Sequence, residues 1–380
     1  MIFDYETVKT IWWIFVGVLL IGFALTDGFD LGVGTLLPFI GKTDQERRVI
    51  INSIGPTWDG NQVWFITAGG ALFAAWPAVY AAAFSGFYIA LLLVLFALFF
   101  RPVGFEYRSK LPDPRWRSAW DWGLFAGGAV PALVFGVAFG NLLQGVPFHY
   151  DDNLRVTYTG SFFGLLNPFG ILSGVVSLSM LVMHGAIFLQ LRTEGNIYHR
   201  TKKAALLFGI ILIVAFALAG LWLSFGIDGF RILTMPSPNS VPNILGKTVQ
   251  HGPGIWLSNY HTYPWMVIAP ILAFIGAVLA LLLSINDRPG TAFIFSGITL
   301  AGVILTAGFT MFPFVMPSSS VPNNSLTMWD ATSSHLTLTL MFWATLIFLP
   351  IVIAYTSWVY SVLRGKVTEE GIEKEKHSAY

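Results

Sequence analysis

The stretch that decides how this chain crosses a membrane is residues 54–77, "IGPTWDGNQVWFITAGGALFAAWP". Its length suits a spanning helix, because about 20 residues cross the roughly 30 Å hydrocarbon core. It also holds glycines, a proline and Asp59, the only charged residue between Val49 and Phe100. The folding of this stretch therefore sets both the number of crossings and the surroundings of a carboxylate.

The composition is that of an integral membrane protein. Of 380 residues, 55% are hydrophobic and 11% charged, whereas soluble domains carry about 25% charged residues. The net charge of +1 gives no reason to expect a nucleic acid partner, and the absence of cysteine excludes disulfides and thiolate metal sites. We expect an all-α integral membrane protein with residues 1–380 forming a single polytopic domain.

Hydropathy predicts about nine transmembrane helices. They are Ile11–Ile40, Val49–Trp76, Ala78–Phe100, Trp122–Leu142, Phe162–Leu191, Ala204–Gly226, Pro264–Ile285, Thr291–Phe314 and Leu336–Val362. The second is the weakest because of its glycines and proline. If it is re-entrant or lies at the surface, eight spans remain.

The distribution of lysine and arginine predicts the orientation. Nine spans place 17 of these residues on one side and 4 on the other, whereas eight spans give 15 and 6. The richer side is cytoplasmic by the positive-inside rule. We therefore expect an N-terminus outside the cytoplasm, an extracytoplasmic loop at 227–263 and a cytoplasmic tail at 363–380.

Asp59 is the first candidate for chemistry. About 15 Å of helix rise from Val49 would place it near the middle of the membrane, where an ionised acid costs about 2.5–3.5 kcal/mol. Such a group must be protonated, paired or hydrated, which suggests a proton relay or an ion site. The alternative is a structural contact with Asn52, Asn61 or Gln62.

Asp27 and Asp30 lie three residues apart and so share one helical face. Two acids this close ionise unequally unless a cation lies nearby. They are candidates for function or assembly, and the alternative is a carboxylate at a helix end that pairs with a neighbouring arginine.

A charge cluster follows the third predicted span and contains Arg101, Glu106, Arg108 and Lys110. Such a cluster commonly sets topology and is solvated. Alternatively, Glu106 and Lys110 form the mouth of a path that leads inward to Asp59.

Only one histidine, His184, lies well within a predicted span. Haem held between helices needs a pair of axial ligands such as His/His or His/Met, so we interpret His184 as a packing residue. Buried acids would also suit a secondary transporter that binds a coupling ion, and the residues alone leave this alternative open.

Eight motifs, in order along the chain, resemble subunit II of the cytochrome bd-type quinol oxidases. They are "DGFDLGVG", "WDGNQVW", "GGALFAAWP", "YAAAFSGFY", "FFRPVGFEYRSK", "AFGNLLQGVPF", "FPFVMPSS" and "LTMWDATSS". The resemblance runs nearly end to end and excludes mainly the loop at 232–262.

The resemblance implies a terminal oxidase of the bacterial inner membrane that oxidises quinol and reduces dioxygen to water without pumping protons. Subunit I of that family carries two haems b and one haem d. Subunit II is its non-haem partner, folded as two four-helix bundles plus a peripheral helix. Small single-helix accessory subunits are further expected partners, and some members hold a structural ubiquinone in subunit II.

The resemblance also implies roles for individual residues. Trp58 and Asp59 match the inner station of a cytoplasmic proton path, and Glu106 and Lys110 match its entrance. Tyr380 matches a terminal tyrosine that lines the same path. Asp30 matches a carboxylate tied to haem d assembly, with Asp27 beside it.

Overall fold

The computed structural model describes residues 3–374. Its α-helices are α1 (Tyr5–Leu25), α2 (Asp27–Ile40), α3 (Asp44–Ile54), α4 (Trp58–Ala75), α5 (Pro77–Gly86), α6 (Tyr88–Tyr107), α7 (Pro114–Gln144), α8 (Phe162–Leu165), α9 (Pro168–Arg192), α10 (Gly195–Gly226), α11 (Ser258–Thr262), α12 (Ile268–Ile285), α13 (Pro289–Met311), α14 (His335–Val362) and α15 (Glu369–Lys374). Short 3₁₀ turns are η1 (Arg108–Lys110), η2 (Ile255–Leu257), η3 (Pro264–Val267) and η4 (Pro322–Asn324). Three small hairpins pair β1 (Phe148–Tyr150) with β2 (Val156–Tyr158), β3 (Asp228–Thr234) with β4 (Thr248–Pro253), and β5 (Phe314–Met316) with β6 (Leu326–Thr327).

The long helices form two groups of four spans and one outlying helix, α14. The first group contains α4, α6, α7 and the broken span formed by α1 and α2, and the second contains α9, α10, α12 and α13. Contacts of α9 with α2 and α7 join the groups, while α14 lies outside and packs along α1. The predicted all-α membrane fold, with two four-helix bundles and a peripheral helix, is confirmed.

Small residues allow the two groups to approach closely. A side chain on Gly32 of α2 would clash with the backbone of Leu181 on α9, and a Cβ on Gly185 would lie 2.7 Å from the amide nitrogen of Val33. Close backbone contact of this kind is typical of membrane helix interfaces, where dispersion replaces the hydrophobic effect. These glycines therefore set the α2–α9 crossing.

Four of the predicted spans are interrupted. The first breaks at Thr26, between α1 and α2; the second breaks at Gly55–Thr57, between α3 and α4; and the third breaks at Phe87, between α5 and α6. The fifth, Phe162–Leu191, breaks near its start at residues 166–167, between α8 and α9. The breaks at Thr26 and at residues 55–57 each let a new helix begin within the bundle, with its first-turn amide groups free to bind polar partners. The continuous helices predicted for these four regions are wrong in this respect.

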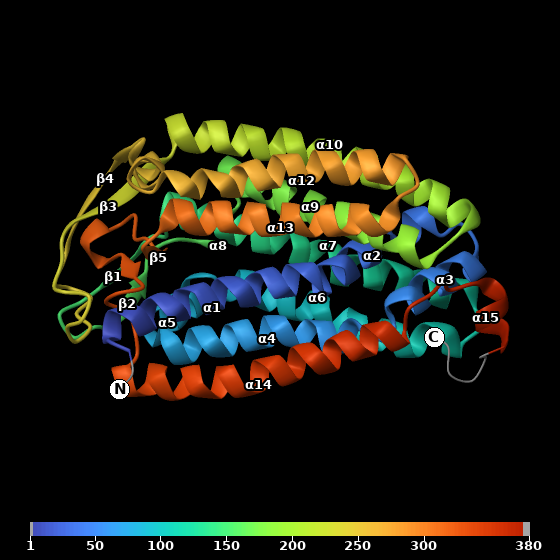
Figure 1. Cartoon of the computed structure of the whole chain (residues 1–380), viewed down its shortest axis with the longest axis horizontal. Coiled ribbons are helices and arrows are strands. Elements are labelled where there is room, and N and C mark those ends of the chain that lie inside the picture. Colours follow the sequence, from blue (N-terminus) through green and yellow to red (C-terminus); the bar gives the residue numbers. More distant parts are fainter. Residues whose placement is uncertain (1–2, 375–380) are drawn as a thin grey trace.

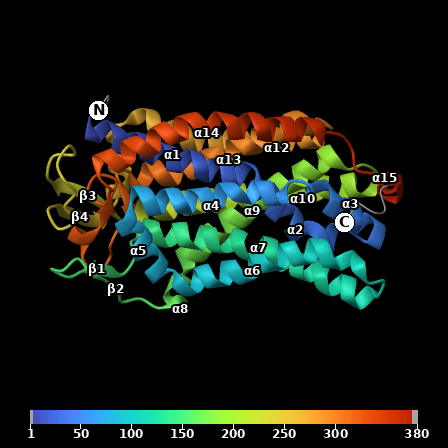
Figure 2. The same cartoon turned by 90° about the horizontal axis from the view of Figure 1, so that it is seen from below.

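Eight of the described helical segments are long and apolar enough to cross a membrane. The 18-residue α4 lies outside that set because its first turns are polar. It is nevertheless about 27 Å long and runs beside α1 within the bundle (Figures 1 and 2). The second predicted span thus belongs to the bundle as α4, with α3 as a separate short helix.

The hairpins gather at one end of the molecule, and α3 and α15 lie at the other (Figure 1). Within the loop at 227–263, β3 and β4 form an ordered antiparallel hairpin. Phe230 of that hairpin packs against Trp256 and Phe314. A buried ion pair of 2.7 Å between Lys247 and Asp330 also holds this end, and burial lowers the pKa of Lys247.

The described part of the tail at 363–380 docks on the helices. Arg192 of α9 donates to the Leu363 carbonyl at 2.6 Å, and Lys366 donates to the carbonyls of Gln190 and Thr193 at 2.7 Å each. In α15, Ile372 is buried, and the helix packs against α3. This segment is therefore part of the packed structure.

A network of ion pairs holds the α3 end together. Asp121 of α7 accepts from Arg47 at 2.6 Å and from Arg108 at 2.5 Å. On the other side of α3, Glu46 pairs with Arg200 of α10 at 2.6 Å. Glu46 also closes a capping box with Thr43 at the start of α3.

The Glu46–Arg200 pair predicts a pH dependence of stability. Hydrogen bonds from Arg200, followed by backbone amides of Lys42 and Thr43, lower the pKa of Glu46 from 4.5 to about 2. Because the folded-state pKa is depressed, the stabilisation is complete above about pH 4.5 and is lost as the pH falls towards 2. We expect Glu46→Gln to lower the Tm of the detergent-solubilised protein at neutral pH, with a difference that shrinks across that window.

Thermal unfolding, followed by tryptophan fluorescence over a pH series, measures this difference. Glu369→Gln is the matched control, since Glu369 is exposed and has no ion pair within the described residues. A Glu46→Gln deficit that stays constant down to the lowest pH would show that the pair contributes no titratable stabilisation.

Candidate functional site

Asp59 lies in the first turn of α4, next to Trp58. Its side chain is exposed on the surface of this chain, so within this subunit the carboxylate is not buried as the sequence suggested. The reason is the break at residues 55–57, which ends α3 and starts a new helix just before the acid. A carboxylate in a first turn is favoured by the free amide groups and the positive end of the helix dipole.

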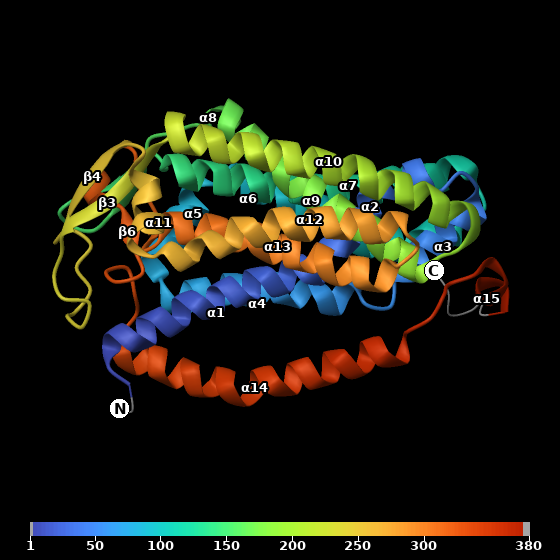
Figure 3. The same ribbon diagram turned by 45° about the horizontal axis from the view of Figure 1, so that its top comes forward.

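A large groove opens in front of Asp59. It has a volume of about 880 Å³ and lies between α14 on one side and α1 and α4 on the other. Figure 3 shows the start of α14 beside the start of α1 and a separation of α14 from α1 and α4 over the rest of its length. Most of the lining is apolar, and its polar groups include Asp59, Asn61, Thr67 and Tyr360.

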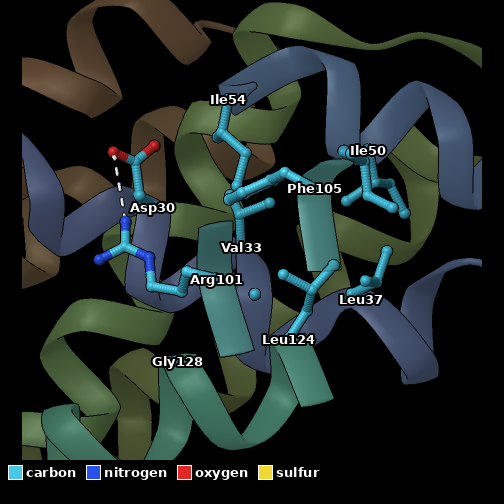
Figure 4. Close-up of a pocket in the computed structure, with 11 residues that line it drawn as sticks. Asp30, Val33, Leu37, Ile50, Ile54, Arg101, Phe105, Leu124 and Gly128 are labelled. Atoms are coloured by element: carbon cyan, nitrogen blue, oxygen red, sulfur yellow. Dashed lines mark ion pairs between the residues drawn. The ribbon is translucent and has the colours of Figure 1, made fainter. Parts of the chain in front are cut away.

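The other two candidate acids form a buried ionic cluster. Asp27 and Asp30 both lie in the first turn of α2 and are 1% and 2% exposed. The guanidinium of Arg101 binds both oxygens of Asp27, at 2.9 and 2.5 Å, and lies 4.0 Å from Asp30 Oδ2 (Figure 4). The expected pairing of a helix-end acid with an arginine is thus present.

The structure overturns the expected setting of Arg101. We expected it at a solvated rim, together with Glu106 and Lys110, but it is 3% exposed and points between α2 and α4. It lies on α6 two turns before the helix end, so its side chain reaches the acids of α2 rather than water. Arg108, the next arginine along the chain, is also buried, against Asp121.

Asn61 and Tyr360 extend the cluster to the groove. The Asn61 amide donates to Asp30 Oδ2 at 2.7 Å, and the Tyr360 hydroxyl donates to Asn61 Oδ1 at 2.6 Å. The Asn61 side chain therefore hydrogen-bonds to Asp30, and not to Asp59 as considered from the sequence. Sequence reasoning missed Tyr360 entirely, because a tyrosine near the end of the last span looks like an ordinary interfacial anchor.

Glu106 and Lys110 are exposed at the end of α6 and in the turn that follows. Neither makes a side-chain hydrogen bond or ion pair to another described residue. Trp58 stacks on Phe105 with ring centroids 5.1 Å apart, and this contact brings the start of α4 beside the residue that precedes Glu106. Tyr380, the last predicted site residue, lies outside the described residues.

The surroundings of His184 do not suit a haem ligand. His184 is buried in α9, with Nδ1 2.7 Å from Ser296 Oγ and Nε2 3.2 Å from the Leu25 carbonyl oxygen. Its ring also stacks on Phe293. Both ring nitrogens are therefore engaged, and residues 3–374 contain no cluster of three or more His, Asp or Glu side chains arranged to hold a metal ion.

Comparison with known proteins assigns the family. The sequence profile described as "Cytochrome bd terminal oxidase subunit II" matches residues 8–363. "Cytochrome bd-I ubiquinol oxidase subunit 2" of Escherichia coli (strain K12) is 56% identical over 377 residues, which is 99% of this chain and 100% of that protein. "Cytochrome bd ubiquinol oxidase subunit 2" of Bacillus subtilis (strain 168) is 35% identical over 364 residues, 95% and 97% of the two chains.

A solved structure shares the fold. A chain of the bd oxidase from Geobacillus thermodenitrificans aligns with a TM-score of 0.65 at 16% identity, covering 95% of this chain and 98% of that one. The alternative of a secondary transporter finds no support in these comparisons. The chain belongs to the cytochrome bd terminal oxidase subunit II family.

Proposed function

We propose that this chain is the non-haem partner subunit of a bacterial inner-membrane oxidase that couples quinol oxidation to the reduction of dioxygen to water. Family membership supports the reaction, and the eight spanning segments support the location. The donor set around His184 supports a haem-free role for this chain. The two haems b and one haem d implied by the family resemblance then lie in subunit I. The observation that carries the rest of the proposal is the exposed carboxylate of Asp59 on α4.

The exposed face of α4 is the docking surface for subunit I. An ionised Asp59 cannot face lipid without a cost of a few kcal/mol, and beside it this face carries Gly60, Thr67 and Gly70. A Cβ on Gly60 or Gly70 would meet no atom of this chain within 4 Å. Small and polar residues on an open helix face are typical of membrane helix–helix interfaces.

Asp59 takes up protons from the cytoplasmic side through an entrance at Glu106 and Lys110. The stacking of Trp58 on Phe105 supports a common location for these groups, and their exposure leaves them accessible to water. Protons cross the remaining gap through hydrogen-bonded water. Tyr380 as a lining residue stays a prediction from the family resemblance.

The proposed orientation places the α3 and α15 end in the cytoplasm and the hairpin end in the periplasm. The positive-inside rule supports this, because the nine-span division of the sequence assigns 17 of the 21 lysines and arginines to the side that includes Lys42, Arg47 and Arg48. The N-terminus is then periplasmic, and the docked tail segment cytoplasmic. Small accessory subunits and a structural ubiquinone stay predictions, since no described residue identifies a site for either.

Asp59→Asn tests the proton path. We expect oxygen consumption by the purified complex to fall by about a hundredfold, at the lower end of what a positioned proton-transfer group contributes, or haem d to be lost. Asp59→Glu should retain more activity because it keeps a titratable group. Asp152→Asn, an exposed loop acid, is the control; normal turnover and haem spectra in both Asp59 variants would falsify the assignment.

Lys110→Glu tests the entrance. We expect a smaller loss of turnover than for Asp59→Asn, because an exposed rim is screened by salt and has other proton donors. The loss should grow when the ionic strength is lowered. Oxygen consumption across a salt series measures this, and a salt-independent loss as large as that of Asp59→Asn would place Lys110 inside the path instead.

Gly70→Leu tests the docking surface. The isolated chain has room for the added side chain, so we expect the chain to accumulate in the membrane but to co-purify with less subunit I and less haem. Gly220→Leu is the matched control, because Gly220 is equally open but lies on α10, in the other group of helices. Normal haem content in Gly70→Leu would show that subunit I docks elsewhere.

A further inference from the structure

The buried cluster holds more acid than base. Two carboxylates, on Asp27 and Asp30, face one guanidinium, on Arg101. Both terminal nitrogens of Arg101 donate to Asp27 in a bidentate pair, while Arg101 Nη2 lies 4.0 Å from Asp30 Oδ2. A buried charge without a close partner costs several kcal/mol, so Asp30 is the member of the pair whose negative charge is not compensated.

One oxygen of Asp30 is left without a partner. Its Oδ2 accepts from Asn61, but its Oδ1 is buried and has no hydrogen-bond partner among the described residues. Asp30 also lines a small cavity of about 10 Å³, close to the volume that a single water needs. Figure 4 shows Asp30 and Arg101 at one side of this cavity and apolar side chains around the rest.

The groups that face Asp30 come from several helices. The charged ones are Asp27 on the same helix and Arg101 on α6, whose charge also interacts with that of Asp59 on α4. The neutral polar ones are Asn61 on α4 and, behind it, Tyr360 on α14. The cavity walls from α3 and α7 are apolar or glycine, namely Ile50, Ile51, Ile54, Leu124 and Gly128.

Tyr360 fixes the orientation of the Asn61 amide. Its hydroxyl donates to Asn61 Oδ1, so the Asn61 nitrogen must face Asp30 and donate to Oδ2. With Oδ2 committed as an acceptor, the remaining oxygen is the one free to carry hydrogen. A protonated Oδ1 would donate into the cavity, where a water accepts.

We propose that Asp30 is a second proton-binding site, which stores a proton on Oδ1 beside one bound water, and that Asn61 and Tyr360 are its positioning residues. This inference rests on the proposed proton path. The step is a simple ionisation: the O–H bond of Asp30 breaks, the electron pair stays on Oδ1, and the proton passes to the cavity water. No oxidant or reductant is involved.

Arg101 couples this site to Asp59. When Asp59 takes up a proton, one negative charge near Arg101 disappears, and ionisation of Asp30 becomes easier. The two acids then exchange one proton between them, and the total charge of the cluster stays constant. Proton uptake at the groove is in this way linked to proton release beside α2.

Infrared difference spectroscopy of the intact complex tests the proposal. We expect a C=O stretching band of a protonated carboxylic acid that shifts in Tyr360→Phe and is lost in Asp30→Asn. Tyr360→Phe removes one hydroxyl and keeps the ring, so it tests the site even if Asp30→Asn fails to assemble. Tyr355→Phe is the matched control, because Tyr355 lines the same groove from α14 and makes no side-chain hydrogen bond within the described residues.

The infrared measurement on Tyr360→Phe and the turnover measurement on Asp59→Asn distinguish this inference from the proposed function. A shift in the acid band of Tyr360→Phe that Tyr355→Phe lacks supports a protonated Asp30. Changes confined to the bands of ionised carboxylates, in an assembled Tyr360→Phe complex, overturn it. In that case the turnover of Asp59→Asn still reports independently on the proton path.

Discussion

The bidentate pair of Arg101 with Asp27 is the interaction on which this arrangement depends. A charge inside a membrane must be paired, and each partner here comes from a different helix, α6 and α2. Through Asp30, Asn61 and Tyr360 the same cluster reaches α4 and the outlying α14. This polar cluster therefore links four helices, α2, α4, α6 and α14.

The helix breaks supply the polar ends that this cluster needs. A helix that begins inside the bundle presents unpaired amide groups and the positive end of its dipole. The break at Thr26 places Asp27 and Asp30 in such a first turn, and the break at Gly55–Thr57 does the same for Asp59. Both candidate functions, proton uptake and subunit docking, are thus located where continuous helices end.

The outlying position of α14 gives the chain an open side. Its contacts are mainly with α1, which leaves the groove in front of α4 uncovered in this subunit. A polar, small-residue helix face beside a wide groove suits a protein that functions in a complex and not alone. The two groups of helices pack directly against each other, through contacts of α9 with α2 and α7.

The sequence by itself determined the class, the approximate positions of the spans and the family, because hydrocarbon thickness constrains helix length and the motifs are ordered along the whole chain. It also identified Asp27, Asp30 and Asp59 as unusual, since acids are rare within apolar stretches. Only the tertiary structure decided that Asp59 is exposed and that Arg101 is buried against Asp27. Tyr360, almost 300 residues from its partner Asn61, was beyond prediction. Hydropathy reports how apolar a segment is, whereas helix breaks and the direction in which each polar side chain points are set by contacts between segments far apart in the chain.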